Sequence, residues 1–107
     1  FILNGAKVNG QSIVPDGWWP DATTKRTDIG QPGRGYGYQW WTYDDGSYTA
    51  RGIFGQGIFI DPKRKLVIVS NANWAGGARD KVATAARDAF YREVQKAIDD
   101  EGAAQAK

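Results

Sequence analysis

Three short runs of apolar and aromatic residues, each bounded by turn signals, constrain the fold of this chain most strongly. The first run, 36–43, ends at Asp-Asp-Gly, and the second, 48–60, ends at Asp-Pro. The third run, 66–69, reads Leu-Val-Ile-Val, and its length and β-branching favour a strand over a helix. Successive strands joined by short turns form an antiparallel meander. The sequence therefore predicts a three-stranded antiparallel sheet in this part of the chain.

A helical pattern follows the predicted strands. Apolar residues recur every three or four positions within 78–98, which predicts a helix with one apolar stripe. The stripe consists of Val82, Ala86, Ala89, Phe90, Val94, Ala97 and Ile98. The adjacent residues Trp40 and Trp41 point to opposite faces of their strand, so both faces of the sheet carry apolar side chains. We therefore expect an α+β fold with the C-terminal helix packed on one face of the sheet.

The chain as a whole divides into three segments of different texture. We predict an irregular segment with short strands and a short helix over 1–35, the meander and C-terminal helix over 36–101, and a disordered tail over 102–107. Within the first segment, the Asn9-Gly10 pair predicts a hairpin between 8 and 14. The stretch from Pro15 to Trp19 predicts the start of a short helix, and 24–35 predicts a surface loop.

The composition excludes several kinds of functional site. The 107 residues include no Cys and no His, which excludes a disulfide scaffold, a cysteine nucleophile, a Ser-His-Asp triad and an imidazole-ligated metal. A carboxylate-only metal site survives this exclusion. The net charge is only +2, which gives no indication of a nucleic-acid partner, and no apolar run approaches the ~20 residues of a membrane span. We expect no metal, no cofactor, no nucleic acid and no membrane span.

Two local patterns are candidate functional features. Asp44-Asp45 could supply paired carboxylates, but Asp-Asp-Gly is ordinary turn chemistry, and we interpret it as a turn. Gly52, Gly55 and Gly57 fall within one predicted strand, where glycines mark either a bulge or a place where a ligand approaches the backbone. Both interpretations stay open. The five Trp and five Tyr favour core packing over a sugar-stacking or base-stacking surface.

An ordered series of short motifs resembles the C-terminal part of the serine β-lactamase-like hydrolases. The motifs are Leu3-Asn4-Gly5, Val8-Asn9-Gly10, Ile13-Val14-Pro15 with Trp18, Gly35-Tyr36-Gly37-Tyr38-Gln39-Trp40-Trp41, Ala50-Arg51-Gly52-Ile53-Phe54-Gly55-Gln56, Ile60-Asp61-Pro62 and Leu66-Val67-Ile68-Val69-Ser70-Asn71. The branch is that of class C β-lactamases, penicillin-binding proteins and related esterases, and the wording of 35–41 is most similar to the 6-aminohexanoate-dimer hydrolases. The resemblance covers about residues 1–100 and implies that the sheet is a fragment of the larger β-lactamase-like sheet.

The resemblance implies a serine hydrolase that cleaves amide or ester bonds of a small molecule through an acyl-enzyme. The family places its nucleophile in Ser-x-x-Lys and a further proton-transfer group in Tyr-x-Asn, and neither motif occurs here. The chain also begins with Phe1 rather than Met. We therefore expect the C-terminal part of a longer enzyme, inactive alone, with the missing N-terminal part of the same protein as its partner and with self-association of the fragment. The compartment stays open between bacterial cytoplasm and periplasm.

The resemblance also implies one active-site element. Ala50-Arg51-Gly52 occupies the place of the family's Lys-Thr-Gly or His-x-Gly motif, and Ile53 matches the residue whose backbone N–H forms half of the oxyanion hole. Ala50, Arg51, Gly52 and Phe54 would contact the substrate. Because Ala50 departs from Lys or His, an amidase or esterase is favoured over a β-lactamase, and Arg51 is a candidate for the missing charge. A stand-alone aromatic-rich binding or interaction module remains the alternative function.

Overall fold

The computed structural model describes residues 1–105 and shows an α+β protein with an antiparallel sheet and a C-terminal helix. The chain divides into two compact units. The first unit consists of residues 1–50 and 58–67, and the second consists of residues 51–57 and the chain from Ile68 onward.

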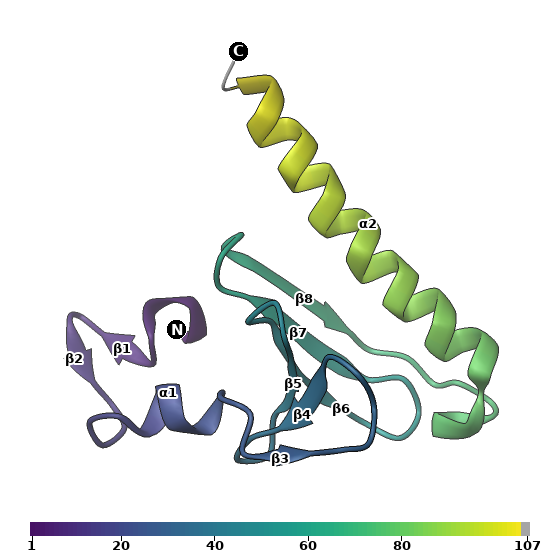
Figure 1. Ribbon diagram of the computed structural model, residues 1–107, viewed down its shortest axis with the longest axis horizontal. Helices are drawn as coiled ribbons and strands as arrows, with labels where there is room; N and C mark the ends of the chain where they lie inside the picture. The colour runs from purple at the N-terminus through teal and green to yellow at the C-terminus, as the bar shows by residue number, and fades with distance from the viewer. Residues whose placement is uncertain (106–107) are drawn as a thin grey trace. The chain divides into compact units, whose positions relative to one another are not determined.

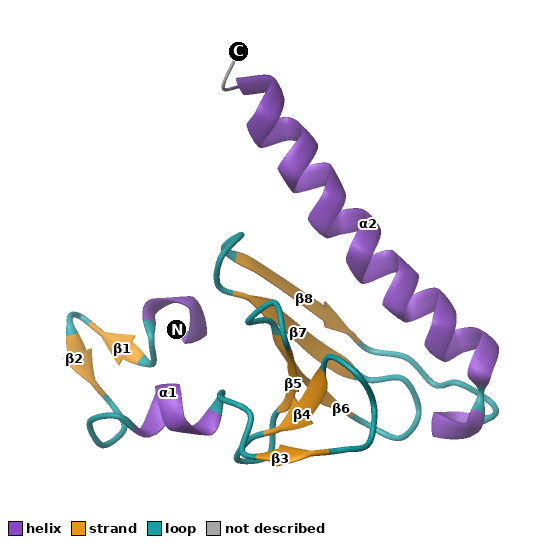
Figure 2. Ribbon diagram, viewed as in Figure 1, coloured by secondary structure: helices purple, strands orange, loops and turns teal. Residues whose placement is uncertain are grey.

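The strands and helices follow one another along the chain as labelled in Figures 1 and 2. They are η1 (Ile2–Asn4), β1 (Lys7–Val8), β2 (Gln11–Ser12), α1 (Trp18–Ala22), β3 (Thr27–Asp28), β4 (Arg34–Tyr36), β5 (Trp41–Tyr43), β6 (Tyr48–Arg51), β7 (Gly57–Asp61), β8 (Leu66–Ser70), η2 (Gly77–Arg79) and α2 (Lys81–Gln105). β1 and β2 form a two-stranded sheet, and β3 to β8 form a six-stranded antiparallel sheet in sequence order.

The prediction of three strands is wrong, because the sheet has six. Two of the additional strands, β3 and β4, come from the 24–35 stretch that was predicted to be a surface loop. In β4, Tyr36 lies opposite Trp41 of β5, and their rings meet edge to face with centroids 4.7 Å apart. Aromatic cross-strand pairs of this kind stabilise a sheet and are invisible in the local polarity of the stretch. The long run 48–60 also divides into two strands, β6 and β7, joined by a loop.

The hairpin and the short helix expected within 1–35 are confirmed. Val8 pairs with Gln11 across the hairpin, and Asn9 and Gly10 have φ values of 50° and 77°. Two successive positive φ values are what a tight two-residue hairpin turn requires, and Asn-Gly supplies them at low cost. The short helix α1 is also present, although it begins at Trp18, after a turn in which the Trp18 N–H donates to the Pro15 carbonyl.

The core of the first unit is built from large side chains of the sheet. Phe59 and Ile60 of β7 are fully buried, as is Tyr48 of β6. The Trp40 ring packs edge to face on Tyr48 at 5.2 Å and on Trp19 at 5.8 Å between centroids. These aromatic residues therefore act in packing, as the composition indicated.

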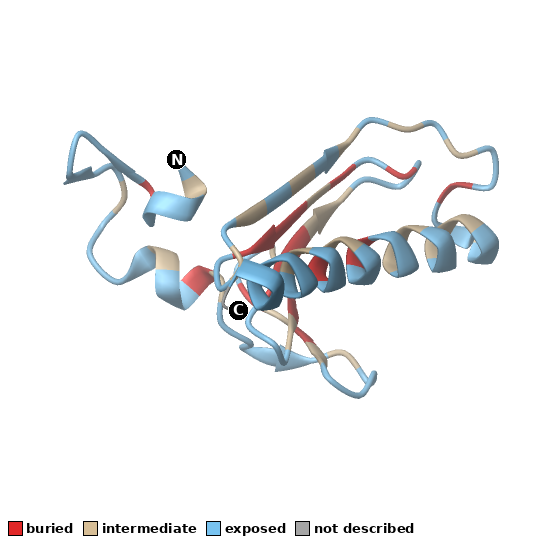
Figure 3. Ribbon diagram, turned by 90° about the horizontal axis from the view of Figure 1, so that it is seen from above, coloured by how far each residue is buried: buried red, intermediate tan, exposed pale blue. Residues whose placement is uncertain are grey.

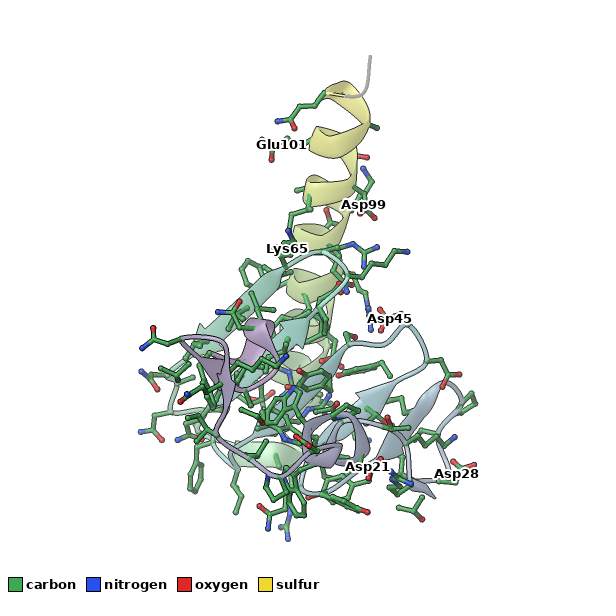
Figure 4. The ribbon with its side chains drawn as sticks, turned by 90° about the vertical axis from the view of Figure 1, so that its left-hand side faces the viewer. Asp21, Asp28, Asp45, Lys65, Asp99 and Glu101 are labelled. Carbon is green, nitrogen blue, oxygen red and sulfur yellow. The ribbon has the colours of Figure 1, made fainter. Side chains whose placement is uncertain are left out.

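A buried carboxylate closes the turn between β7 and β8. Asp61 is fully buried, and one of its oxygens lies 2.8 Å from an Nη atom of Arg64 while the other accepts the Arg64 backbone N–H at 3.3 Å. Lys63 and Lys65 on the same turn are exposed, and Figure 4 labels Lys65 there. The turn predicted at Asp61-Pro62 is thus confirmed, with Lys63 and Lys65 in solvent and Arg64 paired with the buried Asp61.

In the second unit, α2 begins where Asp80 caps it: the Asp80 carboxylate accepts the Ala83 N–H at 2.9 Å. The helix continues to Gln105, so residues 102–105, which were predicted to be disordered, are helical; 106 and 107 lie outside the described residues. The buried residues of α2 are Tyr91 and Gln95, whereas Val82 is 81% exposed and Phe90 56% exposed (Figure 3).

The helix predicted from the apolar spacing is therefore present, but the side of the helix that is buried differs from the predicted apolar stripe. Alanines occur on several sides of α2, so apolarity alone marks a broad face rather than the side that is buried. Val94 and Ile98 of the stripe are half-buried, but Val82, Ala86 and Phe90 lie in solvent.

Candidate functional site

The candidate site lies at the end of β6 and in the loop that follows it. Ala50 and Arg51 are the last two residues of β6 and are half-buried. Gly52, Ile53 and Phe54 lie in the loop 52–56 rather than inside a strand, which corrects the expectation of a continuous strand there. The Gly52 N–H donates to the Gln56 carbonyl at 2.9 Å and closes the loop.

The glycines of this segment are required by the loop itself. A Cβ on Gly52 would come within 2.4 Å of the Gln56 side-chain oxygen, which accepts the Phe54 N–H at 3.1 Å. Gly55 is buried with a φ of 94°, a value that L side chains rarely adopt. The tight loop therefore accounts for both glycines. The sequence had allowed two other interpretations, a bulge or a place where a ligand approaches the backbone.

Ile53 is one of the exposed residues of this loop. Its side chain is 68% exposed, and Phe54 beside it is 48% exposed. Within residues 1–105, the hydrogen bonds of the loop use the N–H groups of Gly52 and Phe54 but not that of Ile53. An unused N–H in a closed loop can donate a hydrogen bond to an external oxygen atom, which is the chemistry an oxyanion donor needs.

Two residues of the second unit outside the loop, Trp74 and Ser70, donate hydrogen bonds to the loop backbone. The Trp74 N–H donates to the Phe54 carbonyl at 2.9 Å, and the Ser70 hydroxyl donates to the Gly55 carbonyl at 3.2 Å. Sequence reasoning missed Trp74 and Gln56 as residues that shape this site. Gln56 could have been found from its place at the end of the glycine-rich motif, whereas Trp74 is 18 positions from Gln56 and carries no local signal.

An apolar cavity of about 400 Å³ lies in the second unit. Its wall includes Gly55 and Trp74 near the loop, Ile68 of β8, and Arg87 and Phe90 of α2. The lining is almost wholly apolar, so the cavity offers volume but few groups that could orient a polar substrate.

The remaining catalytic candidates have structural partners. The hydroxyl of Ser12 donates to the Val14 carbonyl at 2.6 Å, and the hydroxyl of Ser47 donates to Asp45. Asp45, labelled in Figure 4, also accepts the Ser47 N–H at 2.9 Å in the turn after β5, which confirms that Asp44-Asp45 is a turn. Among residues 1–105, no three acidic side chains gather closely enough to hold a metal ion.

One aromatic pair of the first unit is exposed. The rings of Trp18 and Tyr38 lie 5.4 Å apart at 45°, and the Arg26 guanidinium lies 5.5 Å from the Tyr38 ring. A tilted pair is less suited to stacking a flat sugar or base than two coplanar rings.

Comparison with known proteins places the chain in no family: no family model matches it, and no curated protein is similar to it. No helix within residues 1–105 has the length and apolar character that crossing a bilayer demands. The function must therefore be argued from the loop and its surroundings.

Proposed function

We propose that this chain is the C-terminal part of a β-lactamase-like serine hydrolase that cleaves amide or ester bonds through an acyl-enzyme. The chain contributes strand β6, whose C-terminal end borders the substrate, and the oxyanion donor at Ile53. In that enzyme the sheet belongs to the larger β-lactamase-like sheet, and α2 packs on one of its faces. One observation carries the proposal: the Ile53 N–H is unused in a closed, exposed loop at the position that the family motif gives to the oxyanion donor.

The chemistry divides between this chain and its partner. The nucleophile and the base come from the Ser-x-x-Lys and Tyr-x-Asn motifs of the missing N-terminal part of the same protein. The Ile53 N–H then donates to the oxygen that becomes negative in the tetrahedral intermediate, at about 3 Å. Ala50 stands where the family motif has Lys or His, so this position offers no charge to a β-lactam carboxylate. The substrate is therefore an amide or ester of a small molecule, and Arg51, next to Ala50, supplies the positive charge.

Exposed apolar side chains of the second unit support the need for a partner. Val69 of β8 is 63% exposed and Val82 of α2 is 81% exposed. Large apolar side chains at the surface mark regions that another chain or segment covers. In the absence of the N-terminal part, the fragment covers them by self-association.

The first test is the reading frame upstream of Phe1, which should encode Ser-x-x-Lys and Tyr-x-Asn. The protein expressed from that frame should hydrolyse activated esters and linear amides and should form a covalent adduct on the serine of Ser-x-x-Lys. The 107-residue chain alone should give the same rate as buffer, because it has no nucleophile with a base. A covalent adduct on Ser12, Ser47 or Ser70 with turnover would contradict the proposal.

The second test addresses Ile53. Replacing the amide at this position by an ester, through semisynthesis, deletes the donor and keeps the side chain. We expect kcat to fall by roughly 10²–10³, as for the loss of one oxyanion donor. Ile53→Val keeps the N–H and should change kcat only slightly. Near-normal kcat in a correctly folded ester analogue would show that Ile53 has another role.

The exposed Trp18–Tyr38 pair favours the alternative function, a stand-alone aromatic-rich binding or interaction module. That function predicts saturable tryptophan fluorescence changes with soluble oligosaccharides or single-stranded oligonucleotides, which Trp18→Ala abolishes. An upstream frame without the two hydrolase motifs, together with such binding, would favour the module.

A further inference from the structure

The loop that carries Ile53 cannot be fixed by burial of its own side chains alone. Ile53 is 68% exposed and Phe54 is 48% exposed, so apolar contact of these side chains holds the loop only in part. An oxyanion donor, however, must be held within about 0.5 Å of its productive position to be effective. The position of the Ile53 N–H therefore depends on groups that hold the loop backbone.

Trp74 holds this backbone in two ways. Its backbone N–H donates to the Phe54 carbonyl at 2.9 Å, a bond that every substitution of the side chain other than proline retains. Its indole ring lies directly against Gly55, since a Cβ on that glycine would come within 2.4 Å of the ring carbon Cε2. The hydrogen bond and the ring contact act on the two residues that follow Ile53.

Arg87 of α2 holds the Trp74 ring in turn. Its guanidinium carbon lies 5.4 Å from the ring centroid, within the range of a cation–π contact. The Arg87 side chain is only 10% exposed, and both its Nε and an Nη donate to Asp88 at 3.1 Å. Burial and the carboxylate restrict the guanidinium, so the ring is in contact with a group that is itself fixed.

We propose that Trp74, held by Arg87, is the positioning residue of the Ile53 N–H. The backbone contact fixes the Phe54 carbonyl, the ring fixes Gly55, and α2 transmits its rigidity to the loop through Arg87. The catalytic meaning of this arrangement rests on the proposed function, but the order of the loop does not and can be measured in the chain itself.

The test measures backbone order in the ¹⁵N-labelled 107-residue chain. We expect an order parameter of about 0.85 at the Ile53 N–H, as in rigid backbone, and a decrease below about 0.6 in Trp74→Ala. Trp74→Phe retains an aromatic face and should restore most of the order. Arg87→Met retains an apolar stem without the guanidinium and should give an intermediate value.

Phe90→Ala is the matched control. Phe90 lines the same cavity as Trp74 but makes no contact with the loop among those described for residues 1–105, and its removal should leave Ile53 as ordered as before. Equal disorder in Phe90→Ala and Trp74→Ala would overturn the proposal, because the loop would then respond to any loss of packing. Unchanged order in Trp74→Ala would also overturn it. If Trp74→Ala does not fold, Arg87→Met decides: unchanged order at Ile53 in that variant overturns the proposal.

A kinetic arm in the intact enzyme separates this proposal from the proposed function. Trp74→Ala and Arg87→Met should lower kcat by about 10-fold to 100-fold, the cost of a small misplacement of a catalytic group, and leave KM within about twofold, whereas Trp74→Phe should retain most of the parent kcat. Loop disorder without any change in hydrolysis would remove Ile53 from catalysis while the role of Trp74 in ordering the loop stands. A rise in KM with normal kcat would contradict a positioning role.

Discussion

The two units of this chain differ in how they are filled. In the first unit, Tyr48, Phe59 and Ile60 are buried in the sheet, and the small residues Ala6 and Ala22 are buried as well. Within the part of the second unit that the structure describes, Tyr91 of α2 is the one buried hydrophobic residue. Both units have a cavity and exposed large apolar side chains, so the difference lies in the number of buried core residues.

The difference in buried core between the two units shows which contacts fix the backbone of the candidate site. Adjacent strands bring aromatic rings together edge to face, and a sheet therefore closes a core within a few residues. A single helix buries only one side of its surface, so the second unit depends more on individual hydrogen bonds and ring contacts than on a buried core. The Ile53 loop is held by hydrogen bonds and by the Trp74 ring, and not by a filled core.

The largest effect that tests this comparison comes from deleting a phenyl ring in each unit. Phe59→Ala should lower the free energy of unfolding by about 3–5 kcal/mol, because Phe59 is fully buried against neighbours such as the Tyr43 ring. Phe90→Ala should cost less than about 1 kcal/mol, because the ring is 56% exposed. Urea unfolding followed by fluorescence measures both. Equal losses would show that the two units are filled alike.

A smaller effect is expected where the second unit is tight. Gly55→Ala forces a Cβ against the Trp74 ring and should cost about 1–3 kcal/mol for overpacking, added to the about 1–2 kcal/mol of a left-handed backbone. Gly46→Ala is the control: its φ is 87°, but no atom lies within 4 Å of the added Cβ, so only the backbone cost applies. Thermal unfolding of both variants measures the difference. Identical losses would mean that Trp74 moves away freely.

The buried tyrosine of the first unit should give a pH-dependent effect. Burial raises the pKa of Tyr48, an effect that a hydrogen bond with the Trp19 side chain partly offsets. The folded state therefore retains the phenolic proton at pH values where the unfolded chain loses it, and stability falls as the pH rises above 10.0, the ordinary pKa of a tyrosine. Tyr48→Phe should cost about 1 kcal/mol at pH 8 and should reduce the alkaline loss.

Denaturant unfolding between pH 8 and pH 11 measures this behaviour. Tyr38→Phe, whose ring is exposed, should retain the alkaline loss of the parent chain. If Tyr48→Phe loses stability at high pH as steeply as the parent, the buried hydroxyl is not the group responsible.

The smallest effect on stability concerns the exposed residues of α2. Val82→Ser should change the free energy of unfolding by less than about 0.5 kcal/mol, because the side chain is in solvent. It should nevertheless weaken self-association, which sedimentation velocity at several concentrations detects. Val8→Ser, at an exposed valine of the first unit, is the control and should leave association unchanged. A chain that is monomeric at all concentrations would show that the second unit needs no cover.

The sequence by itself determined the turns and the elements that depend on local chemistry. Asn9-Gly10 supplies the positive φ values of a tight turn, and Asp61-Pro62 closes another. The periodicity of α2 and the strand character of Leu66–Ser70 follow in the same way, from residues within a few positions of one another. The candidate residue Ile53 came from the resemblance, and its role stays a prediction.

Only the tertiary structure decided which segments pair and which faces are buried. Strand β4 pairs with β5, where Tyr36 lies opposite Trp41. The loop 52–56 is closed by hydrogen bonds with Gln56 and Trp74. In α2 the buried aromatic residue is Tyr91 and not Phe90. These outcomes depend on contacts between side chains that are distant in the sequence or on the phase of a helix with alanines on several sides. Their energies are absent from any local pattern, since they arise only when the two surfaces are brought together.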